Sequence, residues 1–281
     1  MNSKILDGKK LAKKIREEIA QKVIHLKNEK AIIPGIAVII LGEDPASHTY
    51  VNMKEKACKE VGFYSEIHRL QNSTKEEELL KLIEQLNHNE KIHGILVQLP
   101  LPDHINENII NAHISPFKDV DGFHPSNLGK LFLGQPSFVS CTPKGIIKLL
   151  KYYGVEIRGK HAVVIGRSNI VGKPIATLLL NEDATVTLCH SKTRDLAQYT
   201  QQADIIVSAV GKAHLINHKM IKREAIIIDA GMNRLNGSLV GDIDFHDVIE
   251  KVKLITPVPG GVGPMTITML LENTLEAALR S

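Results

Sequence analysis

The sequence predicts an α/β fold built from two α/β domains. Apolar strand-like runs alternate with helical patterns along the whole chain, which is typical of βαβ units and a parallel sheet. The alternation restarts near residue 141, and 281 residues suffice for two medium domains. We therefore assign residues 1–141 plus 265–281 to one domain and residues 142–264 to the other.

The first half shows three strands separated by two helices. We expect strands at 35–41, 63–69 and 94–98, and helices near 45–60 and 75–86. Asp44 and Pro45 supply an N-cap and an N1 proline for the first helix, and Gly62 lies just beyond its end. Ser73 or Thr74 is expected to cap the second helix, whose first turn is acidic.

The second half repeats this rhythm. A helix is expected from Thr142 to about residue 152, then a strand at 161–165, a glycine-containing loop and a helix from Lys173. Further strands are expected at 184–189, 204–209, 225–229 and 253–255. They are almost continuously apolar, as in a sheet covered on both faces. A last helix at 266–279 should return to the first domain.

Composition excludes several classes of protein. The net charge of +4 is spread along the chain, so a nucleic-acid binder is not indicated. No apolar run reaches the roughly 18 residues of a membrane span, and the start lacks the apolar region of a signal peptide. Three distant cysteines fit a reducing cytoplasm. His214 and His218 have helical spacing without a third ligand nearby, so no metal site is expected.

A glycine-containing loop follows the strand at 161–165. Gly166, Arg167 and Ser168 lead to Gly172 and a helix, which is where a Rossmann-type phosphate-binding loop lies. Ser168 replaces the second glycine of the usual pattern. A tight turn without a ligand is the alternative interpretation.

The next strand favours NADP over NAD. An NAD-binding fold usually has a carboxylate at the end of this strand to bind the ribose 2′-hydroxyl, whereas residues 189–193 read CHSKT. Arg167, Ser191 and Lys192 offer donors to a 2′-phosphate. A solvated basic turn is the alternative.

Four residues suggest a reactive centre in the first half. Tyr50 and Lys54 are four apart on one helical face. Gln98 ends an apolar strand, at the edge where parallel sheets place ligands. Asp121 lies on a glycine-bearing turn and suits the N–H groups of a heterocycle. A surface Tyr/Lys pair and an Asx turn are the alternatives.

The run at 257–266 combines stiff and permissive residues. Pro259, Gly260 and Gly261 form its centre, and such a loop can present bare N–H and C=O groups to a flat ligand. A plain turn is the alternative.

Several stretches, in order, resemble the bifunctional methylenetetrahydrofolate dehydrogenase/methenyltetrahydrofolate cyclohydrolase family. The resemblance covers nearly the whole chain, beginning with ILDG at residues 5–8. The matching stretches are YVNMK at 50–54 with KAC at 56–58, GILVQLPLP at 94–102, KDVDGFHP at 118–125, GRSNIVGKP at 166–174 and PVPGGVGPMT at 257–266.

The resemblance implies roles for the first-domain residues. The folate pteridine is expected in an active-site cleft between the two domains. There Tyr50 would stack on the folate, Lys54 would be the catalytic lysine, Gln98 would tune it and Asp121 would anchor the pteridine.

The resemblance also implies a cofactor site and a reaction. Gly166, Arg167, Ser168 and Ser191 fall on NADP-binding positions, and residues 257–261 border both ligands. The family commonly has isoleucine where this chain has Met232, so a packing contact to the cofactor is in question there. The implied activity is oxidation of 5,10-methylenetetrahydrofolate and hydrolysis to 10-formyltetrahydrofolate, in the one-carbon metabolism that supplies purine biosynthesis. A homodimer is also implied.

Two other functions stay open from the sequence. One is a different NADP-dependent dehydrogenase, such as one acting on a cyclic hydroxy acid. It explains the nucleotide loop and a lysine, but not Asp121 together with the loop at 257–266. The other is a non-catalytic nucleotide sensor or scaffold, which would bind NADP without turnover.

Overall fold

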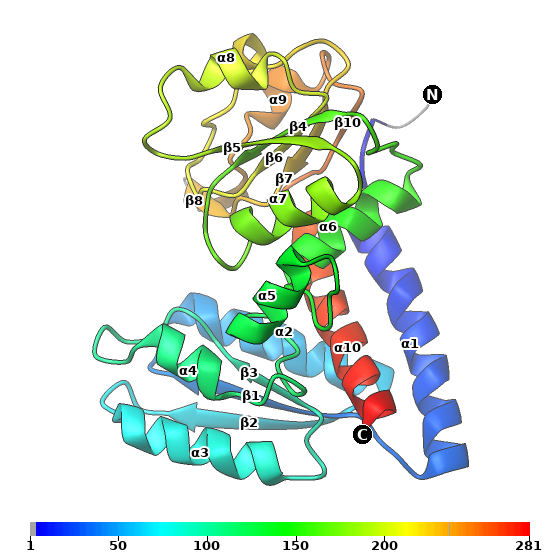
Figure 1. The fold of residues 1–281 in the computed structure, drawn as a ribbon, viewed down its shortest axis with the longest axis vertical. Helices are drawn as coiled ribbons and strands as arrows, with labels where there is room; N and C mark the ends of the chain where they lie inside the picture. Colours follow the sequence, from blue (N-terminus) through cyan, green and yellow to red (C-terminus); the bar gives the residue numbers. More distant parts are fainter. Residues whose placement is uncertain (1–3, 236) are drawn as a thin grey trace. The chain divides into compact units, whose positions relative to one another are not determined.

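The computed structural model describes residues 4–235 and 237–281, which form two compact units. The three-strand unit consists of Lys13–Cys141 and Ile267–Ser281. The five-strand unit consists of the described residues up to Ala12 and Thr142–Thr266. Both units combine parallel strands with helices, so the predicted two-domain α/β fold is confirmed (Figure 1).

The described residues up to Ala12 belong to the five-strand unit, whereas we predicted them in the three-strand unit. Ile5 forms a parallel bridge with Ile255, Leu6 N donates to Ile255 O at 2.8 Å, and Ile255 N donates to Lys4 O at 2.8 Å. Residues 4–6 therefore extend the five-strand sheet, and the assignment of 1–141 to one domain is wrong at this end. Residues 1–3 lie outside the described residues. The last helix does return to the three-strand unit, from Ile267 rather than from residue 265.

The three-strand unit has a parallel sheet in the order β2-β1-β3. Its strands are β1 (Gly35–Leu41), β2 (Tyr64–Leu70) and β3 (Gly94–Val97), and its helices include α2 (Pro45–Val61), α3 (Glu76–His88), α4 (Glu107–His113) and α5 (Pro125–Phe132). Alternate β1 residues such as Ile39 share a core cluster with Ile83 of α3 and Ile110 of α4. Successive strand residues point to opposite faces, so these two helices cover one face of the sheet.

The predicted caps agree with the structure at α2 but not at α3. Asp44 Oδ2 accepts a hydrogen bond from Ser47 N at 2.7 Å, and Gly62 adopts the left-handed conformation with φ of 80°. The N-cap of α3 is Lys75, which makes no side-chain cap bond. Thr74 N instead donates to Gln71 O in a preceding turn, so the prediction that Ser73 or Thr74 caps this helix is wrong.

The five-strand unit has an all-parallel sheet in the order β10-β7-β6-β4-β5. Its strands are β4 (His161–Ile165), β5 (Thr185–Cys189), β6 (Ile205–Ser208), β7 (Ile226–Asp229) and β10 (Leu254–Ile255). Because β5 and β6 lie on opposite sides of β4, the topological switch point is at the end of β4. Such points hold ligands in open α/β sheets.

Further elements complete the chain. They are α6 (Cys141–Tyr152), α7 (Gly172–Asn181), α8 (Leu196–Thr200), the 3₁₀ helix η1 (His218–Met220), the hairpin β8 (Asn233–Leu235) and β9 (Ser238–Val240), and α9 (Phe245–Val248). Helices α1 (Gly8–Lys30) and α10 (Val262–Arg280) contribute residues to both units. Within the described part of the chain, no helix has both the length and the apolarity to cross a membrane.

Candidate functional site

Lys54 occupies a core position on helix α2. The buried residues of this helix include Val51, Lys54, Cys58 and Val61, which recur every three or four residues and so form one stripe. Only 9% of Lys54 is exposed. Lysine is almost never buried without a partner, so its amine must be held by a specific group.

Gln98 provides that group. It directly follows β3, and its backbone N–H donates to Ile39 O at 2.8 Å, which fixes its main chain to the sheet. Its side-chain Nε2 donates to Leu99 O at 2.7 Å. The amide oxygen therefore faces the amine, and Lys54 Nζ donates to Gln98 Oε1 at 3.0 Å. The structure thus joins two predicted site residues that are 44 positions apart.

Asp119 builds the turn that carries Asp121. Its carboxylate, 2% exposed, accepts hydrogen bonds from the backbone N–H groups of residues 122–124 at 2.8–3.1 Å. It also accepts one from Asn127 Nδ2 at 2.8 Å. The carboxylate is therefore fully used by the loop itself. From the sequence, an Asx turn was the alternative role for Asp121, whereas the structure shows Asp119 holding the turn.

Burial and a neighbouring charge shift the pKa of Lys54 in opposite directions. Burial lowers the pKa of Lys54, and the nearby Asp121 carboxylate, followed by Cys141 and Cys58, acts in the opposite direction. Burial raises the pKa of Asp121, and Lys54 opposes that shift. Burial also raises the pKa of the Cys58 thiol to about 12. The environment therefore makes a neutral amine at Lys54 more accessible than on a solvated lysine.

Tyr50 lies one helical turn before Lys54 on α2, so the two side chains share a face. It is partly buried, and desolvation raises the pKa of its phenol. The ring is neutral at physiological pH and offers a flat surface beside the amine. Within the three-strand unit, the structure brings Lys54, Gln98 and Asp121 together and places Tyr50 on the adjoining turn.

Gly122 is required by the turn for two separate reasons. Its φ is +76°, and a Cβ would lie 2.5 Å from Ser140 N. We expect Gly122→Ala to lower the free energy of unfolding by about 2–4 kcal/mol, which sums a left-handed non-glycine residue and a steric clash. Urea denaturation measures this change.

Gly134→Ala is the matched control for Gly122→Ala. Gly134 has φ of +71°, but a Cβ there meets nothing within 4 Å, so this variant isolates the cost of the backbone conformation. Equal losses of stability in the two variants would contradict the close-packing argument at Gly122.

The loop after β4 is built around two glycines. Gly166 has φ of +114°, and a Cβ there would lie 2.4 Å from Ala209 O. A Cβ on Gly172 would lie 2.0 Å from Gly166 O. The loop is therefore closed tightly on itself and on the end of β6. This geometry lets a ligand approach the backbone at the start of helix α7.

The side-chain hydrogen bonds of Ser168 account for a serine where the usual pattern has its second glycine. Its Oγ accepts hydrogen bonds from Val171 N at 3.1 Å and Gly172 N at 3.2 Å, while its carbonyl accepts one from Lys173 N. The serine thus closes the turn that opens α7. Ser168 and Arg167 are both exposed, as the predicted contacts with a ligand require.

The turn after β5 offers donors and no carboxylate. His190 N donates to Thr193 Oγ1 at 2.9 Å, and Lys192 N donates to His190 Nδ1 at 3.1 Å. These bonds leave Ser191 and Lys192 exposed at the tip. A glycine loop, a helix N-terminus and this basic turn, at the switch point of the sheet, fit a dinucleotide with a 2′-phosphate.

The proline–glycine loop is anchored to the start of α1. Val258–Pro259 is a cis peptide bond, and Gly260 has φ of +109°. Lys9 N donates to Gly260 O at 2.9 Å, and Gly261 N donates to Pro257 O at 2.9 Å. Pro259 itself is exposed. The loop has a defined conformation, as predicted, and its role in ligand binding stays a prediction.

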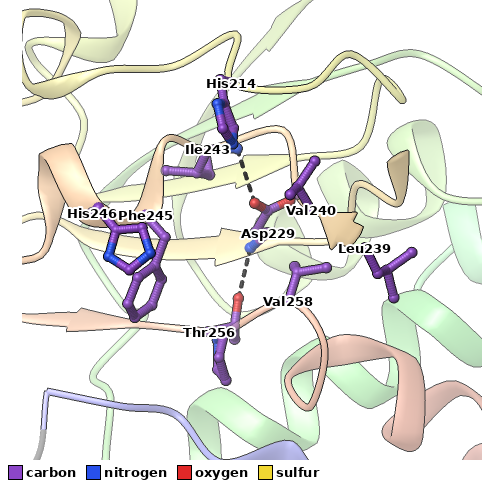
Figure 2. Close-up of a pocket in the computed structure, with 11 residues that line it drawn as sticks. His214, Asp229, Leu239, Val240, Ile243, Phe245, His246, Thr256 and Val258 are labelled. Carbon is purple, nitrogen blue, oxygen red and sulfur yellow. Dashed lines mark hydrogen bonds between the residues drawn. The ribbon is translucent and has the colours of Figure 1, made fainter. Parts of the chain in front are cut away.

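A cavity of about 230 Å³ lies at the carboxyl ends of β7 and β10, beside Asp229, Thr256 and Val258 (Figure 2). Asp229 N donates to Thr256 Oγ1 at 2.7 Å, and Ile243 N donates to Asp229 Oδ2 at 2.9 Å. Burial raises the pKa of Asp229 to about 6, although three backbone N–H donors act in the opposite direction. Met232 follows this aspartate closely and is 48% exposed.

Of the two histidines considered as metal ligands, His218 pairs with a carboxylate. His214 has φ of 52°, and His218 Nδ1 lies 2.7 Å from Asp247 Oδ1. Among residues 4–235 and 237–281, no cluster of three His, Cys, Asp or Glu side chains is arranged to hold a metal ion.

The sequence matches two domain models of one protein family. Residues 6–121 match the model of the tetrahydrofolate dehydrogenase/cyclohydrolase catalytic domain, and residues 140–281 match that of the NAD(P)-binding domain of the same family. A bifunctional protein FolD from Moorella thermoacetica is 57% identical over 281 residues, which is 100% of both chains.

Solved structures agree. The FolD dehydrogenase/cyclohydrolase from Campylobacter jejuni is 54% identical, with a TM-score of 0.97 and 98% of both chains covered. The Trypanosoma brucei enzyme, solved with NADP cofactor and an inhibitor, is 42% identical, with a TM-score of 0.95 and 98% of this chain and 97% of that chain covered. The chain therefore belongs to the tetrahydrofolate dehydrogenase/cyclohydrolase family.

Proposed function

We propose that this chain oxidises 5,10-methylenetetrahydrofolate with NADP⁺ and hydrolyses the resulting 5,10-methenyltetrahydrofolate to 10-formyltetrahydrofolate. The observation that carries the proposal is the buried Lys54 amine, bonded to Gln98 at 3.0 Å and influenced by Asp121. The amine is held by a neutral amide and its pKa is lowered, which suits a lysine that gains and loses a proton. A lysine kept only for a structural ion pair would be held by a carboxylate. Membership of the family supports the same activity.

Each residue near Lys54 has a proposed task. Tyr50 stacks on the flat folate ring and holds it beside the amine. Asp121 accepts N–H groups of the pteridine in a two-point contact, as carboxylates do with fork-shaped donors. Gln98 orients the lysine amine through its fixed amide oxygen. Residues 259–261 of the proline–glycine loop contribute backbone groups to substrate binding.

Lys54 acts as general base and then general acid in the hydrolytic step. It takes a proton from the attacking water as the carbon–oxygen bond forms and gives a proton to the ring nitrogen as the carbon–nitrogen bond breaks. The remaining hydroxyl proton passes to solvent as the formyl C=O forms. A lysine with a pKa of about 10.4 needs roughly 4–5 kcal/mol to be neutral at pH 7. Burial reduces this cost, and the positive charge of the bound methenyl substrate reduces it further because like charges oppose each other.

The five-strand unit is proposed to hold the dinucleotide. NADP⁺ supplies a hydride acceptor for the methylene carbon of the folate. Gly166 and Ser168 shape the phosphate loop, and Arg167 and Ser191 donate to the 2′-phosphate. Met232 borders the cofactor through its backbone. Alignment of two flat rings accounts for most of the rate enhancement in this step, so no acid–base pair is needed there.

A direct assay tests the proposal. Purified protein is mixed with 5,10-methylenetetrahydrofolate and NADP⁺, and both NADPH and folate products are measured. The proposal predicts NADPH together with 10-formyltetrahydrofolate. Binding of NADP without turnover would favour a nucleotide sensor, and turnover of a cyclic hydroxy acid in its place would favour the other dehydrogenase.

The proposal also covers the compartment and the oligomeric state of the protein. Cys58, Cys141 and Cys189 are buried and form no disulfide bond, as expected for a protein of the reducing cytoplasm. We propose that the chain works there as a homodimer and that its product supplies one-carbon units for purine biosynthesis. Size-exclusion chromatography with light scattering tests the dimer.

A further inference from the structure

Asp242 binds several separate segments at the carboxyl edge of the five-strand sheet. The residue is fully buried, with 0% of its surface exposed. Its Oδ2 accepts hydrogen bonds from Ser208 Oγ at 3.0 Å and Val210 N at 2.8 Å. Its Oδ1 accepts from Lys212 N at 2.9 Å and Asn233 Nδ2 at 3.1 Å. One buried carboxylate thus serves four donors.

These donors belong to the part of the sheet that faces a ligand in folds of this type. Ser208 ends β6, and residues 210 and 212 form the loop that follows it. Asn233 follows β7 by four residues, and Ser208 is paired with Asp229 across the two strands. Loops after adjacent parallel strands line the ligand crevice in open α/β sheets. Asp242 therefore ties the β6 loop to the segment after β7.

Asp229 makes the reciprocal contact, so the two carboxylates interlock. Asp229 Oδ1 accepts from Gly231 N at 2.9 Å and Asp242 N at 3.0 Å. A Cβ on Gly231 would lie 2.1 Å from the Asp242 carboxylate, and a Cβ on Gly241 would lie 1.8 Å from Asp229 Oδ2. The Asp242 carboxylate thus packs against Gly231, two residues after Asp229, and the Asp229 carboxylate packs against Gly241, which directly precedes Asp242. The backbone leading to Met232 is fixed from both sides.

We infer that Asp242 is a positioning residue for the dinucleotide, because it fixes the β6 loop at 209–212 and the segment at 231–233 at the sheet edge. This inference rests on the proposed function of the five-strand unit. Preorganised loops spare the ligand the entropic cost of ordering them, so loss of Asp242 should weaken cofactor binding without touching the cofactor's own contacts.

Asp242→Asn tests this role, because the amide keeps the shape but replaces one acceptor with a donor that faces N–H groups. We expect the KM for NADP⁺ and the Kd for NADPH, measured by fluorescence titration, to rise about tenfold, the scale of one lost hydrogen bond to a charged group. The rise in Tm on adding NADP⁺ should shrink accordingly. Hydrolysis of methenyltetrahydrofolate, which uses the Lys54 group, should be retained.

Asp247→Asn is the matched control. Asp247 lies in the same unit, is exposed, and accepts a backbone hydrogen bond at 2.6 Å from His218, which belongs to neither loop. It should leave NADPH binding unchanged. Ser208→Ala, which removes one donor and no backbone partner, should give a smaller rise in Kd than Asp242→Asn.

An unchanged Kd for NADPH in Asp242→Asn would overturn the inference. So would an equal fall in hydrolysis and in hydride transfer, because Asp242 would then support the whole fold and not the cofactor loops. Failure of the wild-type protein to reduce NADP⁺ with methylenetetrahydrofolate, while NADPH still binds, would refute the proposed function and leave the Asp242 binding test intact.

Discussion

Lys54→Met is expected to reduce hydrolysis of methenyltetrahydrofolate by about 10²- to 10⁴-fold, the usual contribution of a positioned general acid–base. Methionine retains most of the side-chain volume on the buried stripe of α2 but has no titratable proton. Hydride transfer should fall less, because the lysine takes no proton in that step. Initial rates of methenyltetrahydrofolate consumption and of NADPH formation, measured on the same preparation of protein, give the two activities.

Lys56→Met is the control for this variant. Lys56 lies on the same helix two residues later and is exposed, so its loss changes the charge without altering the buried stripe. Both activities should be retained. Wild-type hydrolysis by Lys54→Met would refute the assignment of the amine, whatever the effect on hydride transfer.

Arg167→Ala is expected to remove the preference for NADP⁺. A hydrogen bond to a charged group contributes about 1.5–3 kcal/mol, so kcat/KM with NADP⁺ should fall roughly 10- to 150-fold. The value with NAD⁺, which has no 2′-phosphate, should change little. Steady-state rates with each dinucleotide give the ratio of kcat/KM values before and after the substitution.

Arg223→Ala separates this effect from general loss of positive charge. Arg223 is also exposed in the same unit, but it precedes β7 and so lies toward the amino edge of the sheet, opposite the phosphate loop. Its removal should leave the ratio unchanged. The same ratio in wild type and Arg167→Ala would show that another group, such as Ser191 or Lys192, recognises the phosphate.

The fold followed from the sequence where periodicity and local chemistry agreed. All the predicted strands exist, because each is a short apolar run with clear boundaries. Helix α1 was not predicted, although Leu11, Ile15 and Ile19 are buried at four-residue spacing and Asp7 Oδ1 accepts from Lys10 N at 2.9 Å. That helix was predictable from its residues.

Other elements were not predictable from local patterns. Helix α5 is only 8 residues long. Pro125 opens it, but its N-cap is His124, whose Nδ1 accepts a hydrogen bond from Ser126 N, and histidine is an uncommon N-cap. The pairing of residues 4–6 with β10 joins segments about 250 residues apart. Such long-range pairing depends on which strand edge is available in the finished sheet and on nothing local.

Some residues of the candidate site were predictable from the sequence, and others were not. A polar residue at a strand end identified Gln98, and glycine spacing identified the phosphate loop around Gly166. The supporting carboxylates Asp119, Asp229 and Asp242 act through hydrogen bonds to backbone N–H groups, and a single aspartate in a sequence does not reveal such bonds. Their roles emerged only from the distances.

Product analysis of Lys54→Met tests the central claim most directly, that one chain performs two steps with separate chemical groups. The variant is supplied with 5,10-methylenetetrahydrofolate and NADP⁺, and the folates are separated over time. Our account predicts that NADPH forms while methenyltetrahydrofolate accumulates. Formation of 10-formyltetrahydrofolate at the wild-type rate would contradict it.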